Sequence, residues 1–275
     1  MSSKYVDEER LARRSRQEYA FDDRLDGRSV LVAGGAGGLG AAVCARLMAV
    51  GADVVLGYAR DAERAASVKS GLEGHFKGSV SLLQADIGTD AGREEALAAL
   101  DPDTLYGAVV CVGDPSRVAP DEMGLTALED AMRLNYTGPI LLARGCAEIL
   151  AQGSTPGALV LLSSMQGVAA FPGSLAYSGP KSALVHAGRI LAQEYGGARN
   201  IRVNVVAPGV TESGMALSSI GSGKYDPYVD SGVIPRFGYP EDIARAVWFF
   251  MAPDNYVTGQ ALLVDGGLTL RRGTV

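Results

Sequence analysis

Residues 29–40 read Ser-Val-Leu-Val-Ala-Gly-Gly-Ala-Gly-Gly-Leu-Gly, and a helix-like stretch follows over residues 41–50. The β-branched run predicts a strand, and the glycines predict a tight turn between that strand and the helix. Glycines let a pyrophosphate approach the main chain closely, and the amino end of a helix offers free N–H groups and a positive dipole. The stretch is therefore typical of the first βα unit of a fold that binds a dinucleotide.

Six further apolar runs have strand-like composition, near residues 54, 81, 109, 160, 204 and 262, and stretches with helical periodicity separate most of them. Strands that alternate with helices imply right-handed crossovers and a parallel sheet. With 275 residues, 47% of them hydrophobic, the chain fits one domain better than two. We therefore expect a single α/β domain with a doubly wound, parallel, seven-stranded sheet flanked by helices, which is the Rossmann fold.

Two segments fall outside this alternation. Residues 1–26 mix many charges with a few apolar side chains, which predicts an N-terminal extension before a Rossmann-type domain over residues 27–275. Residues 211–238 combine several glycines with small polar residues, which predicts a long loop with a short helix. This loop follows the sixth strand and suits either a lid over a ligand or an ordinary surface loop.

The composition bounds the class of ligand. A net charge of −6 argues against a surface that binds nucleic acid or an anionic membrane. No run approaches the ~18 apolar residues of a membrane span, and the charged amino terminus does not resemble a secretory signal. These observations predict a cytoplasmic protein that binds a small molecule, with no nucleic-acid or membrane partner.

Cysteine and histidine are scarce. The three cysteines, Cys44, Cys111 and Cys146, lack metal-ligand spacing and lie in apolar runs, which favours core residues in a reducing compartment over disulfides or catalytic thiols. The two histidines, His75 and His186, lie near no cysteine pair. We therefore expect no metal site and no serine–histidine hydrolase.

Tyr177 and Lys181 are four residues apart, and Ser164 lies just past the apolar run at residues 158–162. Positions i and i+4 share one face of a helix, so the Lys181 ammonium is expected near the Tyr177 phenol. There it would favour the anion of a group whose ordinary pKa is about 10. Ser164 could hydrogen-bond a substrate oxygen on which charge collects during hydride transfer. Alone, such a Tyr–Lys pair is more typical of an ordinary surface helix, but here it accompanies a dinucleotide-binding turn.

The residues after the second predicted strand bear on the choice of dinucleotide. NAD-specific proteins usually carry an acidic residue there, against the adenosine ribose. This chain has Gly57, and the next charged residue is the cation Arg60. We expect NADP(H) to be preferred, with NAD(H) possible, because Arg60 could bind a 2′-phosphate and no acid would repel it. Arg60 could equally be a solvated residue in the first turn of a helix, and Asp61 beside it counts against the preference.

Further motifs occur in a fixed order along the chain. They are the glycine spacing Gly34, Gly38 and Gly40, then Asp86-Ile87, Asn135, the set Ser164, Tyr177 and Lys181, Pro208-Gly209 with Thr211, and the runs at residues 256–260 and 264–267. In this combination the chain resembles the short-chain dehydrogenase/reductase family, and the likeness runs from about residue 27 to about residue 270.

The resemblance implies a catalytic set of Asn135, Ser164, Tyr177 and Lys181. Tyr177 would be the general acid in reduction, and Lys181 would lower the Tyr177 pKa and bind the nicotinamide ribose. Ser164 would orient the carbonyl, and Asn135 would anchor a water in a proton relay. With Arg60, the implied cofactor-binding residues are Gly34, Gly38, Leu39, Gly40, Asp86, Ile87, Gly113, Tyr177, Lys181, Pro208, Gly209, Val210 and Thr211.

The chain departs from the family's pattern at two places. Ala33 stands where the family usually has Thr, and residues 110–113 read Val-Cys-Val-Gly where it usually has Asn-Asn-Ala-Gly. Packing must then replace side-chain hydrogen bonds that brace the central sheet. Because Gly113 remains where the adenine ribose passes, cofactor binding is expected to persist.

The leading hypothesis is a ketoreductase, an oxidoreductase that transfers a hydride between NADP(H) and a ketone or secondary alcohol, in the direction of carbonyl reduction. One alternative is a 3-oxoacyl carrier-protein reductase, the kind of member that the chain resembles in general. Residues 151–156 and 191–194, however, lack the cations expected to dock an acidic carrier protein. A second alternative is a cofactor-binding regulator without turnover, which the altered residues 110–113 favour and the complete catalytic set opposes.

The expected substrate pocket includes Met165, Gln166, Phe171 and Met215. This mostly apolar set favours an aliphatic, cyclic or aromatic ketone or alcohol over a sugar phosphate.

A homotetramer or homodimer is also expected. The helix after Tyr177 carries small residues at near-helical spacing, and the family usually pairs this helix across a dimer axis. The same residues could instead pack against the sheet of their own chain. They are Ala183, Ala187, Gly188 and Ala192.

Overall fold

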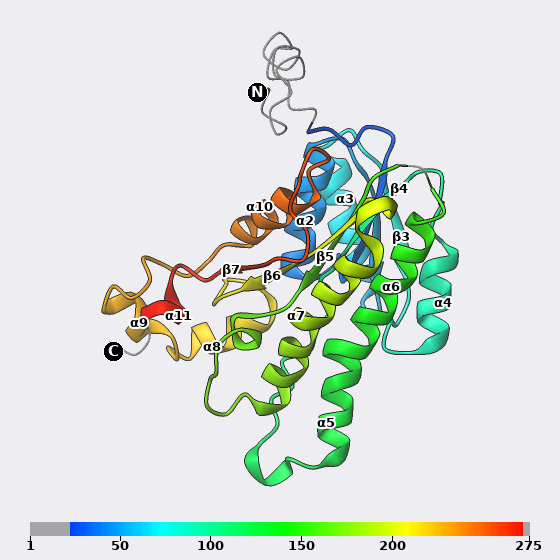
Figure 1. Cartoon of the computed structure of the whole chain (residues 1–275). Coiled ribbons are helices and arrows are strands. Elements are labelled where there is room, and N and C mark those ends of the chain that lie inside the picture. The colour runs from blue at the N-terminus through cyan, green and yellow to red at the C-terminus, as the bar shows by residue number, and fades with distance from the viewer. Residues whose placement is uncertain (1–22, 154, 272–275) are drawn as a thin grey trace, which may run out of the picture.

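The computed structural model describes residues 23–153 and 155–271. Its sheet has seven strands, every neighbouring pair is parallel, and the order is β3-β2-β1-β4-β5-β6-β7 (Figure 1). The strands are β1 (Ser29–Ala33), β2 (Asp53–Tyr58), β3 (Val80–Gln84), β4 (Leu105–Val110), β5 (Gly157–Leu162), β6 (Ile201–Pro208) and β7 (Ala261–Val264). The predicted doubly wound Rossmann fold is confirmed.

Helices cover both faces of the sheet (Figure 1). One face carries α2 (Gly38–Ala49), α3 (Ala62–Glu73) and α10 (Pro240–Met251), and the other carries α4 (Asp90–Ala98), α6 (Gly138–Leu150) and α7 (Leu175–Tyr195), with α5 (Leu125–Met132) against α7. A π-helical turn, η2 (Arg133–Thr137), joins α5 to α6. The remaining short elements are η1 (Pro120–Glu122), η3 (Met165–Gly167), η4 (Gly197–Arg199), η5 (Gly214–Ala216), α8 (Leu217–Gly221), α9 (Asp226–Asp230) and α11 (Leu268–Arg271).

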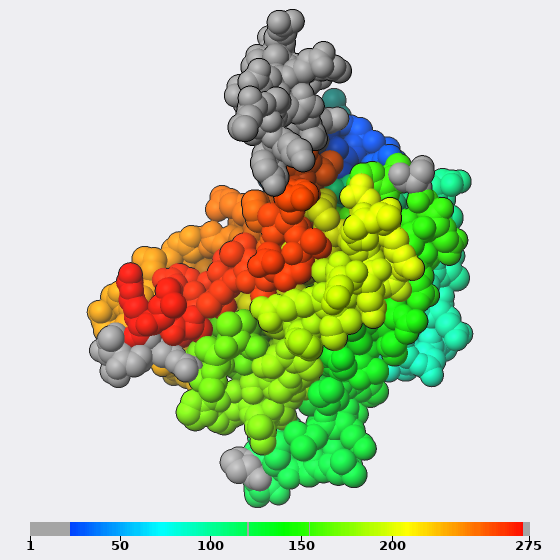
Figure 2. Space-filling view, viewed as in Figure 1, coloured from blue at the N-terminus to red at the C-terminus, as the bar shows by residue number. Residues whose placement is uncertain are grey.

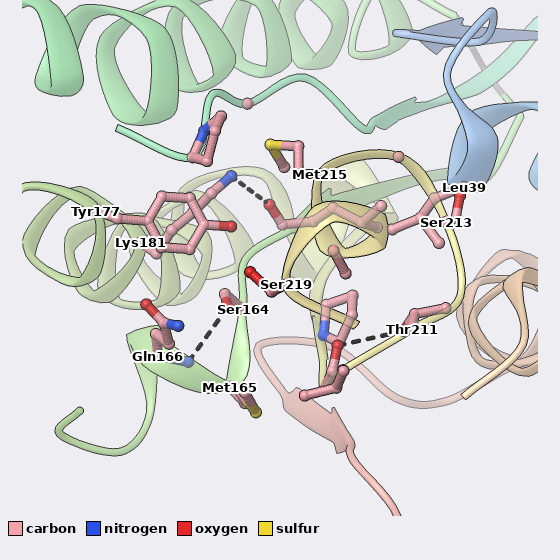
Figure 3. A pocket seen from close by; sticks show the side chains of 18 of the residues that line it. Leu39, Ser164, Met165, Gln166, Tyr177, Lys181, Thr211, Ser213, Met215 and Ser219 are labelled. Carbon is pink, nitrogen blue, oxygen red and sulfur yellow. Dashed lines mark hydrogen bonds between the residues drawn. The ribbon is translucent and has the colours of Figure 1, made fainter. Parts of the chain in front are cut away.

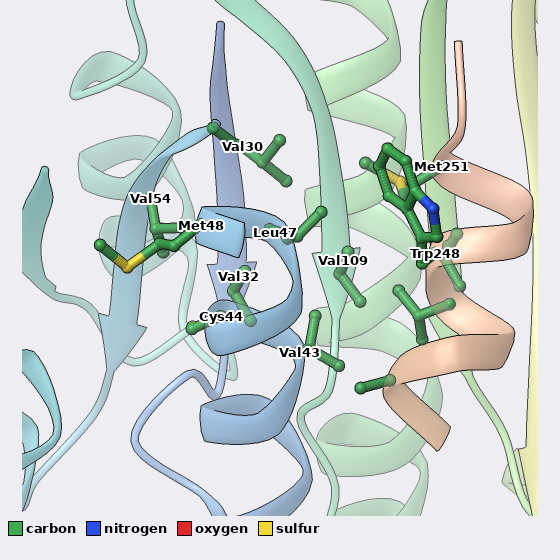
Figure 4. Packing of buried hydrophobic residues seen from close by; sticks show 14 of the residues in the cluster. Val30, Val32, Val43, Cys44, Leu47, Met48, Val54, Val109, Trp248 and Met251 are labelled. Atoms are coloured by element: carbon green, nitrogen blue, oxygen red, sulfur yellow. The ribbon is translucent and has the colours of Figure 1, made fainter. Parts of the chain in front are cut away.

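Alternation along the strands divides the apolar side chains between two cores. Val30 and Val32 of β1 face α2 and α10, whereas Leu31 and Ala33 face the opposite layer. Figure 4 shows the first core, where Leu47 of α2 packs among the strand valines. Burial of each such large side chain stabilises the fold by about 1.5–3 kcal/mol. Because both faces are covered, the central strands read as nearly continuous apolar runs, which is why the sequence locates them well.

Three boundaries differ from the sequence-based expectation. Helix α2 begins at Gly38 rather than at residue 41, because Gly37 takes the extended conformation of an N-cap. Strand β2 continues to Tyr58, so Gly57 lies within the strand, where a β-carbon would lie 3.2 Å from Ala33 Cα. The segment over residues 211–238 contains η5 and two short helices, α8 and α9, rather than one helix.

The topology fixes where a ligand can bind. The chain proceeds from β1 toward β2 and β3, then crosses back to β4 on the other side of β1. A crevice therefore opens between the carboxyl ends of β1 and β4, which is the usual ligand position in open parallel sheets. The residues that directly follow these two strands are Gly34 and Cys111.

Most of the expected N-terminal extension, residues 1–22, lies outside the described residues. Leu25 is 2% exposed and packs in the first core, and its main-chain N–H donates to the Val50 carbonyl at 2.9 Å. Within the part of the chain that the structure describes, no helix is both long and apolar enough to cross a membrane.

The small residues of α7 pack inside their own chain. Ala187, Gly188 and Ala192 are buried, and a β-carbon at Gly188 would lie 2.7 Å from the Val205 side chain of β6. Their size is thus explained by close approach of α7 to the sheet. The homotetramer or homodimer stays a prediction, without support from these three residues.

Candidate active site

A cavity of about 510 Å³ lies at the carboxyl ends of the central strands. Its lining includes Gly34 after β1, Gly113 after β4, Ser164 after β5 and Gly209 after β6. Residues that are up to 194 positions apart in the sequence (228 minus 34) therefore meet around one space. The sheet topology accounts for this convergence, because parallel strands end at the same edge.

Tyr177 and Ser164 face each other across this cavity. Tyr177 lies in the first turn of α7, and Figure 3 shows its hydroxyl directed toward the same space as the Ser164 side chain. Ser164 caps η3, where its Oγ accepts from the main-chain N–H of Gln166 at 3.2 Å. Burial raises the pKa of Tyr177 above its ordinary value, and a hydrogen bond with Ser164 opposes that rise. Tyr177 is therefore a neutral phenol at physiological pH, able to donate a proton.

Lys181 lies one turn further along α7 and is 2% exposed. Its ammonium donates to the main-chain oxygen of Leu162 at 3.0 Å and to that of Val112 at 3.5 Å. Burial lowers the Lys181 pKa to about 8. Nζ lies 5.8 Å from the centroid of the Tyr177 ring. Burial is the largest influence on the Tyr177 phenol and raises its pKa, so the lowering expected from Lys181 stays a prediction.

Asn135 is fully buried in the π-helical turn between α5 and α6. Its Oδ1 accepts from the main-chain N–H of Asp114 at 3.0 Å, and its Nδ2 donates to Ser116 Oγ at 3.1 Å and to the Ala131 carbonyl at 3.2 Å. Single π-helical turns often occur at functional sites. A β-carbon at Gly113 would lie 2.9 Å from both Asn135 Oδ1 and the Lys181 Nζ. Glycine at this position thus lets the loop after β4 pass between two predicted catalytic side chains.

The glycine-rich turn after β1 is packed closely against its surroundings. Gly34 has a φ of +80°, which other residues rarely adopt. A β-carbon at Gly40 would collide with the Gly34 carbonyl, and one at Gly38 would collide with the Ser213 hydroxyl. Leu39 also lines the cavity, and α2 begins at Gly38, so the free N–H groups of this helix lie at the cavity's edge.

A second cavity, of about 450 Å³, shares five lining residues with the first and extends toward β2 and β3. Arg60 lines it together with Asp61, Asp86 and Ile87. Asp61 caps α3, and its Oδ1 accepts from the Arg64 main-chain N–H at 2.9 Å. The carboxylate that counted against NADP(H) is thus engaged by the helix. The shared residues are Gly34, Gly37, Cys111, Val112 and Gly113.

All four predicted substrate-pocket residues line the first cavity, as do Pro208, Gly209, Val210 and Thr211. A polar and aromatic part of the wall, contributed by two loops, was not predicted from the sequence; it consists of Ser116, Arg117, Ser219, Lys224, Tyr225 and Tyr228. Arg64, which lines the second cavity, was not predicted either. The signal for Arg64 was its place in the first turn of the helix that Asp61 caps, directly after Arg60.

The cysteines are not all core residues. Cys44 and Cys146 are fully buried, but Cys111 is partly exposed and lines both cavities. Burial raises the pKa of Cys111 to about 12, so its sulfur stays a neutral thiol at physiological pH.

Comparison with known proteins places this geometry among oxidoreductases. Residues 34–269 match a family described as Enoyl-(Acyl carrier protein) reductase. The chain is 32% identical over 260 residues to a glucose 1-dehydrogenase from Gluconobacter oxydans, across 91% of this chain and 95% of that protein. Its structure is similar to that of a short-chain type dehydrogenase/reductase from Mycobacterium ulcerans, with a TM-score of 0.83 and 29% identity over 90% and 91% of the two chains. It is also similar to the angucycline C-6 ketoreductase LanV with bound NADP, with a TM-score of 0.79 and 26% identity over 90% and 97% of the two chains.

Proposed function

Because this chain belongs to the short-chain dehydrogenase/reductase family, we propose that it transfers a hydride between NADP(H) and a ketone or secondary alcohol, in the direction of carbonyl reduction. One observation carries the proposal. The Tyr177 phenol, the Ser164 hydroxyl and the glycine-rich turn after β1 line the same cavity. A proton donor and a dinucleotide site must share one space for a hydride and a proton to reach the same carbonyl group.

The residues around the turn fit a dinucleotide. Gly34, Gly37, Gly38 and Gly40 all line the first cavity beside the amino end of α2, so this part of its wall carries no side chains from the turn. Such a surface suits a pyrophosphate, which needs close main-chain approach and N–H donors. Gly34, Leu39 and residues 208–211 would continue this site toward Tyr177, with Lys181 at the nicotinamide ribose, and Asp86, Ile87 and Gly113 would lie on the adenosine side. A reduced dinucleotide bound there supplies the hydride, with its electron pair, to the carbonyl carbon.

The chain's own residues handle the proton. Tyr177 is neutral because burial raises its pKa, so it can donate its proton to the carbonyl oxygen as negative charge develops there. Ser164 donates a hydrogen bond to the same oxygen and orients it. With a pKa of about 8, Lys181 is mostly an ammonium at pH 7, and its charge stabilises the phenolate that Tyr177 leaves behind. Asn135 holds the main chain at Asp114 and so keeps the loop after β4 beside Lys181.

The surroundings of the second cavity support NADP(H). Strand β2 ends without an acidic residue, Arg60 and Arg64 line the cavity, and the Asp61 carboxylate is bound at the amino end of α3. Asp61 and Asp86 line this cavity too, but each accepts a main-chain N–H, and the two guanidinium groups suit a 2′-phosphate. The similarity to LanV with bound NADP points in the same direction.

Steady-state kinetics with matched variants tests the proposal. The purified protein is mixed with NADPH or NADH and a panel of ketones, and loss of absorbance by the reduced cofactor is followed. We expect turnover with NADPH, and Tyr177→Phe should lower kcat about 10²- to 10⁴-fold while changing the Kd of NADPH far less. Tyr256→Phe, at a fully exposed tyrosine, is the control and should behave as the wild-type protein. Full activity of Tyr177→Phe would refute the assignment, whereas tight NADPH binding without turnover on any ketone would favour a cofactor-binding regulator.

A further inference from the structure

The cavity beside Tyr177 is lined by cations and by no acids. Its charged lining residues are Arg117, Lys181 and Lys224, and no aspartate or glutamate is among the described residues that line it, although the nearby Asp114 carboxylate raises the pKa of Tyr177. The whole chain, in contrast, has a net charge of −6. Charge of one sign around a cleft favours a ligand of the opposite sign. Lys181 is buried and donates to main-chain carbonyls, so the cations open to a substrate are Arg117 and Lys224, which are both exposed.

Arg117 connects the loop after β4 with the segment after β6. Its guanidinium donates to the hydroxyls of Ser218 and Ser219, at 2.7 and 3.2 Å, and to the main-chain oxygen of Met215 at 2.8 Å. All three acceptors are neutral, and neither Arg117 nor Lys224 forms a salt bridge with the residues that the structure describes. The Arg117 charge is therefore hydrogen-bonded but not neutralised. Both serine hydroxyls accept from Arg117 and keep their own protons to donate to an anion.

The backbone that carries Arg117 is firmly positioned. Ser116 has a φ of 43°, and such a conformation persists only where surrounding contacts determine it. Here the Ser116 N–H donates to Asp114 Oδ1 at 2.7 Å, and Ser116 Oγ accepts from Asn135 Nδ2 at 3.1 Å. Asp114 is thus tied into the turn and is not part of the cavity lining. Arg117 follows directly after a turn anchored to the buried amide that lies beside Lys181.

Both exposed cations lie near an aromatic ring of the cavity wall. The Lys224 Nζ lies 5.5 Å from the centroid of the Tyr225 ring. Burial raises the pKa of Tyr225, and the charge of Arg117 is the main influence that opposes this rise. After burial, the Asp114 carboxylate and Tyr225 also raise the pKa of Tyr177. The two cations, Tyr225, Asp114 and the proton donor therefore belong to one electrostatic neighbourhood.

We propose that the substrate is a keto acid, with its ketone at Tyr177 and Ser164 and its carboxylate bound by Arg117 with support from Lys224. This inference rests on the proposed carbonyl reduction and specifies its substrate class. A carboxylate is favoured because its two oxygens match the planar fork of a guanidinium. The wall between the two ends includes Met165, Phe171 and Met215, which suits an apolar carbon skeleton.

Paired substrates test the proposal. The panel consists of keto acids with aliphatic, cyclic or aromatic skeletons and with increasing distance between ketone and carboxylate. Each acid is compared with its methyl ester, which is neutral and of similar shape. In the wild-type protein, at least one acid should exceed its ester in kcat/KM by about 10- to 100-fold, the value of a charge-assisted hydrogen bond. Arg117→Met should bring this ratio close to one by slowing the acid alone, and Arg117→Lys should retain part of it. Lys224→Met should reduce the ratio to a smaller extent.

The control is Lys77→Met, which removes an exposed cation just before β3, at the opposite edge of the sheet, and should leave the ratio unchanged. Wild-type protein that reduces esters as well as acids across the panel would overturn the keto-acid proposal and leave carbonyl reduction standing. An equal loss for acid and ester in Arg117→Met would also overturn it, and would assign Arg117 a purely structural role between two loops. If no compound is reduced, carbonyl reduction fails. In that case, binding of the acids and of the esters is measured by quenching of NADPH fluorescence. Tighter binding of acids than of esters supports anion recognition, and equal binding refutes it.

Discussion

Replacement of Lys181 by methionine should stabilise the fold at neutral pH while abolishing catalysis. Lys181 is 2% exposed, and burial lowers its pKa from the ordinary 10.5 to about 8. This fall corresponds to a cost of about 3 kcal/mol for keeping the ammonium inside the folded protein. Methionine has a similar length and no charge, so it removes that cost. It also removes the hydrogen bonds to the Leu162 and Val112 carbonyls, which offset the gain by about 1 kcal/mol each.

The net gain at pH 7 is therefore about 1 kcal/mol, and its sign depends on pH. The folded wild-type protein releases the Lys181 proton near pH 8, whereas the unfolded chain holds it up to about pH 10.5. Between these values the unfolded state binds more protons, so wild-type stability rises with pH. Above this window the cost of the buried charge has disappeared, and Lys181→Met retains only the loss of its hydrogen bonds. The variant should then be less stable than the wild-type protein by about 2 kcal/mol.

Urea unfolding of both proteins at several values between pH 7 and pH 10.5 measures this crossover. The difference between the two curves isolates Lys181, because all other titrating groups are shared. Lys77→Met provides the control, since its side chain is exposed and its stability difference should not vary with pH. A variant that is already destabilised at pH 7, or a difference that does not change with pH, would refute the inference that the Lys181 ammonium is held at an energetic cost.

Two further variants probe the main chain and the cofactor site. Gly113→Ala places a β-carbon 2.9 Å from both Lys181 Nζ and Asn135 Oδ1, so thermal unfolding should report a loss of about 1–3 kcal/mol together with weaker NADPH binding. Its control, Gly71→Ala within α3, has no atom within 4 Å of the new carbon and should gain about 0.5–1 kcal/mol; a neutral Gly113→Ala would contradict the packing argument. Arg60→Ala should lower kcat/KM for NADPH about 10- to 100-fold and leave that for NADH nearly unchanged. An equal loss with both cofactors would argue against a 2′-phosphate site at Arg60.

The strands and motif residues could be predicted because simple periodic constraints determine them. Strands such as β5 are buried on both faces, so their sequences are continuous apolar runs that stand out from the helices. Motif residues such as Gly34, Ser164 and Gly209 directly follow these runs, and the parallel topology then brings them together. The start of α2 was misplaced by three residues because the conformation of Gly37, rather than apolar periodicity, decides where that helix begins.

The missed part of the cavity wall has a different physical origin. Arg117, in the loop after β4, donates hydrogen bonds to Ser218 and Ser219 of the short helix α8, about 100 positions further along the chain. Neither segment has a sequence signal that predicts how it folds over the cavity. The apolar residues near motif positions, such as Met165, were predictable because the motif fixes their place. The part of the wall that we propose to govern substrate choice was not predictable, because it depends on how the loop after β4 meets the segment after β6.

The loop after β4 explains how the site tolerates its departure from the family pattern. Cys111 stands where the family usually has a polar side chain, yet its main-chain N–H donates to the Ala33 carbonyl at 2.8 Å and continues the pairing of β4 with β1. Its thiol remains neutral, because burial raises its pKa to about 12, so it adds no charge beside the path of a dinucleotide. Over residues 111–114, the contacts that this loop makes to Asn135 and Lys181 come from main-chain atoms, at Asp114 and Val112. Side chains at residues 110–112 can therefore vary as long as they pack. Gly113 cannot vary in the same way, because a β-carbon there would enter the space in which the Asn135 amide and the Lys181 ammonium lie.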